Sequence, residues 1–219
     1  MTPLTIQAGE RAYARIQRDG LRTDDIAAVF GASGAAKWLG IYGLDSAIFS
    51  QWLRPATQRI LLYGTSVGAF KLAAAAQADP AAAFKRLADS YIEQNYSEGL
   101  SPEAIASETE RIIDTVLPPQ AIADVLNSSK YIFSCAAVQC SGPLASAAPS
   151  QQRLGMLHAA LRSILPRGRG ARAGVMQDAY KRVIFAHPDA ATWLHPTAGQ
   201  LHNLCEQTFK PAILASGSL

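Results

Sequence analysis

Hydrophobic positions fall into short continuous runs that are separated by longer periodic stretches. Four runs rich in branched and aromatic residues predict buried strands, at residues 26–30, 59–63, 130–140 and 182–186. Helical spacing or abundant alanine predicts helices at about residues 7–19, 38–49, 66–78, 80–96, 101–116, 119–126, 153–165 and 208–215. Buried strands alternating with helices are typical of a parallel sheet that is covered on both faces. The pattern therefore predicts one three-layer α/β/α domain over residues 1–219, with a mostly parallel central sheet.

Composition narrows the class of protein. The 219 residues are 49% hydrophobic and 17% charged, which suits one globular domain with a real core. A net charge of +3 does not indicate nucleic-acid binding, and we interpret the basic run from Arg162 to Arg172 as a solvated loop rather than a site for anionic head groups. Three cysteines without a C-x-x-C motif, and a start without a signal-peptide pattern, predict a cytoplasmic protein that at most touches a membrane peripherally.

A serine lies at the junction of the second predicted strand and its helix. Gly64 to Gly68 form a G-x-S-x-G match, and the strand–turn–helix context is that of a nucleophile elbow. In such a turn Ser66 adopts a strained backbone that lifts its hydroxyl from the sheet edge, and the flanking glycines avoid collisions with neighbouring backbone. The helix N-terminus favours an anion at that point. The sequence thus predicts Ser66 as a nucleophile, with an ordinary glycine-rich turn as the alternative.

A second glycine-rich loop, residues 31–37, follows the first predicted strand. For a P-loop, Lys37 fits, but Ala36 replaces the second glycine and Trp38 replaces the hydroxyl that would bind Mg²⁺. For a dinucleotide loop, the glycines at 31 and 34 fit, but Lys37 replaces the third glycine and no acidic residue ends the second strand. Binding of NAD(P) by the Gly31–Gly34 loop is therefore a weaker alternative.

The same loop can instead serve the elbow. Both follow neighbouring parallel strands, so they should face each other across one crevice. Main-chain N–H groups would then form an oxyanion hole for an acyl group on Ser66. The expected donors belong to Ser33, Gly34, Ala35, Ala36 and Val67. We interpret Lys37 as an anchor of the loop.

This order of elements resembles the patatin-like phospholipases, in a bacterial branch. Their loop reads roughly G-G-G-x-[RK]-G, and residues 33–38 keep its second glycine and basic residue but depart at Ser33, Ala35 and Trp38. The elbow, residues 37–39, residues 76–80 and residues 214–218 extend the resemblance over most of the chain. It implies hydrolysis of an acyl ester, such as that of a phospholipid, by a Ser-Asp dyad without cofactor or metal.

The aspartate of that dyad lies in a D-G-[GA] motif near the end of the family's catalytic domain. The only Asp-Gly here is Asp19-Gly20, and Leu219 falls about where relatives continue toward the motif. We therefore expect a truncated form of a longer enzyme, or a short member that has lost activity. Turnover should be weak or absent, because an unassisted serine hydroxyl barely ionises near neutral pH.

Two other interpretations remain open. Ser66, Asp178 and His202 follow the chain order of an α/β-hydrolase triad, although those folds place the elbow after more strands than the two found here. Alternatively, a degenerate domain binds lipid or a partner through the same crevice without catalysis.

Overall fold

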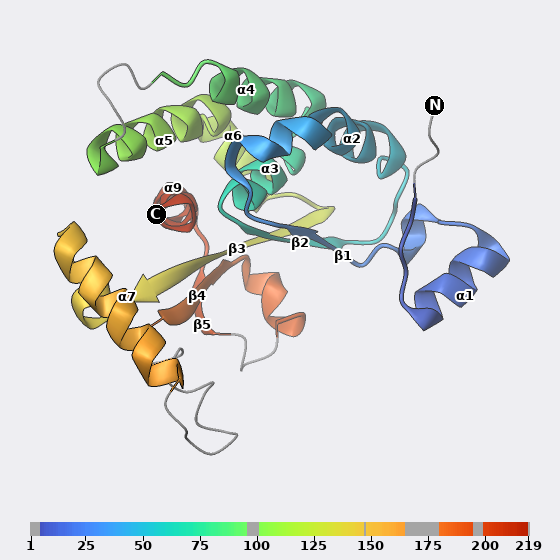
Figure 1. The fold of residues 1–219 in the computed structure, drawn as a ribbon. Coiled ribbons are helices and arrows are strands. Elements are labelled where there is room, and N and C mark those ends of the chain that lie inside the picture. The colour runs from blue at the N-terminus through green and yellow to red at the C-terminus, as the bar shows by residue number, and fades with distance from the viewer. Residues whose placement is uncertain (1–4, 96–100, 147, 165–179, 195–198, 219) are drawn as a thin grey trace.

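The computed structural model describes residues 5–95, 101–146, 148–164, 180–194 and 199–218. Its five strands form one sheet in the order β1 (Ala28–Gly31), β2 (Ile60–Thr65), β3 (Tyr131–Cys140), β4 (Tyr180–Ala186) and β5 (Gln200–Asn203) (Figure 1). The pairs β1–β2, β2–β3 and β4–β5 are parallel, and β4 runs antiparallel to β3. The predicted α/β class and mostly parallel sheet are confirmed. The short exposed strand β5 was not predicted.

The helices connect these strands on a pattern close to the predicted one. They are α1 (Glu10–Asp19), α2 (Tyr42–Ala47), α3 (Val67–Ala75), α4 (Pro80–Ile92), α5 (Pro102–Val116), α6 (Pro119–Leu126), α7 (Pro149–Ile164) and α9 (Glu206–Gly217). Short 3-10 turns are η1 (Thr23–Asp25), η2 (Ala35–Ile41), η4 (Gly142–Ala145) and η5 (Pro188–Thr192), and η3 (Ile48–Trp52) is a π-turn. The single helix predicted at residues 38–49 is therefore built from η2, α2 and η3. None of the described helices combines the length and hydropathy needed to cross a bilayer.

The two faces of the sheet are covered unequally. Helices α2 to α6 and α9 pack on one face, where Phe84, Phe133 and Phe209 are fully buried (Figure 1). The other face carries a smaller cluster under η5, centred on Leu61, Ile132, Ile184 and neighbouring alanines. Phe30 and Val138 on that face remain 72% and 58% exposed. The layers are thus those of an α/β/α fold, with one thick layer and one thin one.

Candidate functional site

The loop after β1 and the turn after β2 lie side by side, as predicted. Gly31, which ends β1, pairs in register with Gly64 of β2, so both connections leave the same edge of the sheet. Ser33 Oγ lies 3.0 Å from Thr65 Oγ1 and forms a hydrogen bond with it. The glycine-rich loop is therefore tied directly to the residue that precedes Ser66.

Ser66 has the backbone of a nucleophile elbow. Its φ of 53° and ψ of −131° lie in a region that non-glycine residues rarely occupy. Helix α3 begins at the next residue, and the N–H groups of Ala69 and Phe70 donate to the Ser66 carbonyl at 2.8 and 3.2 Å. The N–H of Val67 belongs to the first turn and has no acceptor within the helix. Strand, strained serine and helix start thus follow one another as the motif predicts.

Close backbone packing explains the two glycines of the motif. A Cβ added at Gly68 would lie 2.1 Å from the carbonyl oxygen of Gly31, and one at Gly64 would lie 2.5 Å from the Cα of Ala69. Both contacts are with main chain, which cannot rotate away. The start of α3 therefore rests directly on β1 and β2, and this contact fixes where Ser66 emerges.

Ser216, near the end of α9, locks the turn from the other side. Its Oγ accepts the N–H of Ser66 at 2.9 Å and donates to the carbonyl of Ala136 in β3 at 2.7 Å. One hydroxyl thus joins the elbow, β3 and α9. Our sequence analysis placed residues 214–218 only by resemblance, because a contact across 150 positions leaves no local signal.

The loop after β1 is held by Trp38 rather than by Lys37. The Lys37 side chain is exposed and has no hydrogen bond or ion pair with any described residue. Trp38 is buried, and its Nε1 donates to Asp45 Oδ2 at 2.7 Å, while Lys71 Nζ donates to the same oxygen at 2.8 Å. Within the loop Gly34 is extended, whereas Ala35 has a φ of 46°. The anchor is therefore a buried Trp–Asp–Lys group beneath the loop.

A sequence signal for this anchor did exist. Lys71 is the only charged residue of α3, a helix that is otherwise almost wholly buried. Asp45 is the only acidic residue between positions 26 and 78. A lone charge in a buried apolar helix requires a partner of opposite charge.

A cavity of about 610 Å³ opens at this edge of the sheet. Its lining residues are Ser33, Tyr63, Thr65, Ala136, Ala137, Val138, Cys140, Arg182, Ala215, Ser216 and Ser218. Burial raises the pKa of the Tyr63 hydroxyl above its usual value, so it stays neutral near pH 7. The walls combine small apolar side chains with hydroxyls and one guanidinium. Such a lining can accept an apolar chain that carries a polar or anionic end.

The residues described here offer Ser66 no general base. No described side chain forms a hydrogen bond with its hydroxyl, and the cavity lining contains neither a carboxylate nor an imidazole. His202 of β5 pairs with Phe185, which pairs with Cys135, which pairs with Gly64. Three strand spacings, or about 14 Å, separate His202 from the elbow strand. His202 therefore does not reach Ser66, and the alternative Ser66–Asp178–His202 triad is not formed. Asp178 lies outside the described residues.

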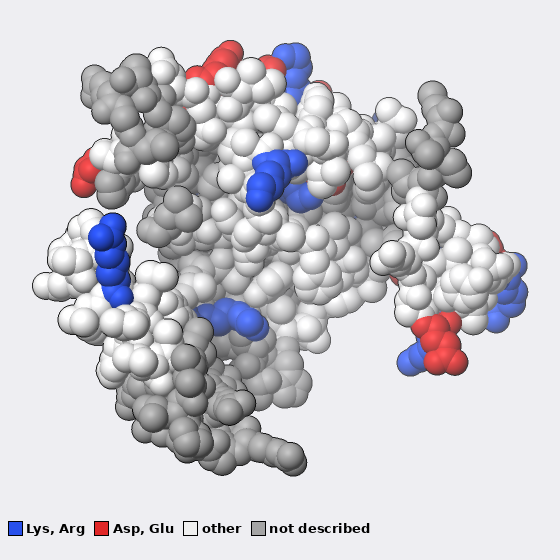
Figure 2. Space-filling view, viewed as in Figure 1, with Lys and Arg blue, Asp and Glu red and all other residues white. Residues whose placement is uncertain are grey.

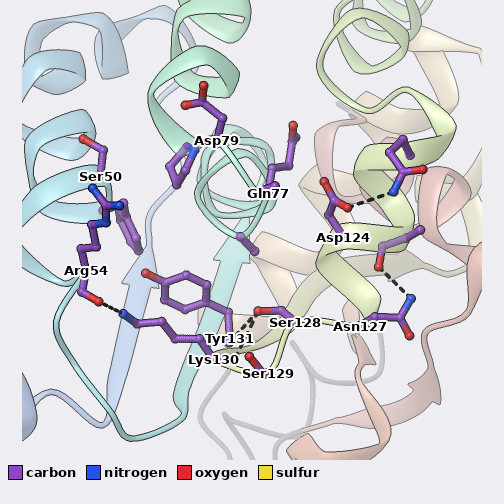
Figure 3. A pocket seen from close by; sticks show the side chains of 16 residues that line it. Ser50, Arg54, Gln77, Asp79, Asp124, Asn127, Ser128, Ser129, Lys130 and Tyr131 are labelled. Carbon is purple, nitrogen blue, oxygen red and sulfur yellow. Dashed lines mark hydrogen bonds between the residues drawn. The ribbon is translucent and has the colours of Figure 1, made fainter.

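A larger cavity, of about 880 Å³, lies at the opposite edge of the sheet, where β3 begins (Figure 3). Its polar groups serve local structure. Lys130 Nζ donates to the carbonyls of Leu53 and Arg54, Asp79 caps α4 through the N–H of Ala82, and Asp124 accepts from Gln120. Burial lowers the pKa of Lys130. Because these groups already have partners, we interpret this cavity as a structural cleft.

The candidate site is therefore the edge that holds Ser66. There the structure brings Ser33 to the elbow through Thr65, and packs the backbone of Gly68 on that of Gly31. That the amides of residues 34–36 and of Val67 serve as oxyanion donors stays a prediction. No group of three His, Cys, Asp or Glu side chains that could hold a metal occurs in the described part of the chain. Comparison with protein-family models, curated proteins and solved structures finds no match, so the function has to be argued from this site.

Proposed function

We propose that this protein is a serine acyl hydrolase that attacks an acyl ester of a lipid, in the manner of the patatin-like enzymes that its sequence resembles. The backbone of Ser66 carries the proposal. A serine at φ 53° between a strand and a helix start stores conformational strain, and such strain persists where the surroundings enforce it. Two hydrogen bonds supply that enforcement: the Ser66 N–H donates to Ser216 Oγ at 2.9 Å, and Ser33 Oγ bonds Thr65 Oγ1 at 3.0 Å.

The reaction would proceed through an acyl-enzyme. Ser66 Oγ forms a bond to the ester carbonyl carbon and gives up its proton, while the carbonyl oxygen becomes an oxyanion. The N–H of Val67 and the loop amides of residues 34–36 donate to that oxyanion. Collapse breaks the ester C–O bond and releases the alcohol, which takes up a proton. Water then attacks the acyl-serine by the reverse sequence and releases the carboxylic acid.

The rate depends on the base that removes the Ser66 proton. The described residues supply none within hydrogen-bonding reach of Ser66, so we expect these 219 residues to turn over esters slowly. An electrophile that needs little activation should still react, because the strained turn presents Ser66 at the start of α3, where main-chain N–H groups favour an anion. We therefore expect Ser66 to react with such electrophiles while the protein turns over ordinary esters slowly.

Labelling with a fluorophosphonate probe tests this proposal. The wild-type protein and a Ser218→Ala control should be labelled at one site, and Ser66→Ala should not be labelled. Ser218 is a suitable control because it lines the same cavity but bonds only to the carbonyl of Leu214. Hydrolysis of a short-chain nitrophenyl ester, measured in parallel, should be slow and should vanish in Ser66→Ala.

A non-catalytic lipid-binding domain is the second candidate, favoured by the absence of a base near Ser66 among the described residues. It predicts that a fluorescent fatty acid binds at the cavity while the probe labels no serine. Labelling that is equal in the wild type and in Ser66→Ala would remove the hydrolase proposal.

A further inference from the structure

Helix α7 exposes an apolar stripe. Leu154, Leu157 and Leu161 are between 54% and 62% exposed, and their spacing of three and four residues places them along one side of the helix. The opposite side rests on η4, where Gly155 approaches Leu144 so closely that a Cβ would lie 2.8 Å from its Cγ. The leucines thus point away from the body of the protein. Figure 1 shows α7 at the margin of the fold.

The sequence of α7 and of the residues that follow it carries charge of one sign. Helix α7 contains no acidic residue, and Arg153 is exposed beside Leu154. In the sequence, residues 149–177 contain no Asp or Glu, and their basic residues are Arg153, Arg162, Arg167, Arg169 and Arg172. In Figure 2 the surface over α7 carries a basic side chain and no acidic one. The chain as a whole has a net charge of +3, whereas this segment has five basic residues and no acidic one.

We propose that α7 docks on an anionic phospholipid surface, with its leucines among the acyl chains and Arg153 at the head groups. An exposed row of leucines with a basic and no acidic neighbour on the helix is typical of helices that lie in a membrane interface. An anionic bilayer favours such a helix over a protein partner of mixed charge, since each basic residue near the bilayer gains about 1 kcal/mol and an acidic one would be repelled.

The position of α7 relates this surface to the candidate site. Val138 and Cys140 line the cavity that also includes Thr65 and Ser216, and the chain runs from the end of β3 through η4 into α7. Docking by α7 would therefore bring the cavity toward the lipid. The inference does not depend on the proposed hydrolysis, because it concerns binding alone.

Sedimentation with vesicles tests the inference on the whole chain. The wild type should bind vesicles of phosphatidylcholine and phosphatidylglycerol (7:3) at least about tenfold more tightly than pure phosphatidylcholine, and 0.5 M salt should weaken the binding. Arg153→Ala should weaken it about fivefold. The double variant Leu157→Glu/Leu161→Glu should weaken it at least about tenfold.

A matched control is available on another helix. Ile92 of α4 is 69% exposed, so Ile92→Glu makes the same kind of change away from α7 and should leave binding within about twofold of wild type. Circular dichroism checks that each variant folds. Binding by Ser66→Ala equal to wild type would support docking even if the serine proved unreactive.

Three results would overturn the inference. One is no binding to anionic vesicles. Another is equal binding by the wild type and the double leucine variant. The third is a wild-type dimer that the double variant dissociates, without any vesicle binding, since the stripe would then be an interface between two copies.

Discussion

Replacing Ser216 with alanine should loosen the elbow without touching Ser66 itself. The change removes one oxygen atom and with it two hydrogen bonds, to the N–H of Ser66 at 2.9 Å and to the carbonyl of Ala136 at 2.7 Å. Alanine suits the interior of a helix, so α9 itself should be unaffected. The consequences therefore arise from the two main-chain groups that lose their partner.

The size of the effect follows from those two bonds. A hydrogen bond contributes about 0.5–1.5 kcal/mol net, and a buried group left without a partner costs about 1–3 kcal/mol. Ser216 and Ser66 are only partly buried, so water can satisfy some of the lost bonding. We expect the free energy of unfolding to fall by about 2 kcal/mol. Because the N–H of Ser66 is no longer held, we also expect labelling by a fluorophosphonate to slow by about tenfold.

Urea unfolding followed by circular dichroism measures the first effect, and the rate of probe labelling measures the second. Ser218→Ala is the matched control, since it lies two positions away on the same chain segment and loses only a bond to the Leu214 carbonyl. It should stay within about 0.5 kcal/mol of wild type. Ser216→Thr retains the hydroxyl and should recover most of the labelling rate.

The reasoning fails if Ser216→Ala unfolds at the wild-type urea concentration and is labelled at the wild-type rate. Ser216 would then contribute neither to stability nor to the position of Ser66, and β2 and α3 alone would maintain the strained turn. A loss of stability with an unchanged labelling rate would show that Ser216 supports the fold but does not position the serine.

Three further substitutions test the surroundings of the site. Gly68→Ala should cost at least about 3 kcal/mol of stability or prevent folding, because its Cβ would lie 2.1 Å from the carbonyl of Gly31; denaturant unfolding or the yield of soluble protein measures this. Ala35→Gly should raise the free energy of unfolding, measured with urea, by about 0.5–1 kcal/mol, because glycine adopts a φ of 46° without strain. Lys71→Met should destabilise by about 3–5 kcal/mol in thermal unfolding, since it leaves Asp45 buried without its cation, and adding Asp45→Asn should recover part of the loss.

The elements that sequence predicts well are those with a strong local pattern. Helix α6 has the predicted bounds, and α5 agrees to within one residue, because a proline opens each helix and apolar residues recur at helical spacing. Strand β5 is short and exposed at all four positions, so its sequence carries no burial signal. The pairing of β5 with β4 depends on the tertiary structure, which the local sequence does not indicate.

The same distinction holds for the candidate site: the contact set by the sheet topology could be predicted, and the contacts between distant side chains could not. That the loop after β1 faces Ser66 could be predicted, since neighbouring parallel strands deliver their connections to one edge. The role of Trp38 could have been inferred from the isolated charges of Asp45 and Lys71, but we assigned the anchor to Lys37 because a family pattern has a basic residue there. Ser216 could not be predicted, since its partners lie 150 and 80 positions away.

The strain in the backbone makes a final argument for this edge of the sheet. Among the described residues, the non-glycine positions with positive φ are Ala35 and Ser66, and they lie on the two connections that meet through Ser33 and Thr65. Each costs on the order of 1–2 kcal/mol, which a marginally stable fold retains only where other contacts compensate. Those contacts are present: a buried Trp–Asp–Lys group beneath one connection and the Ser216 hydroxyl beside the other. If the edge were ordinary loop structure, the strain would be expected to be scattered or relieved by glycine. Its concentration on two connections that contact each other supports the proposed preorganised site.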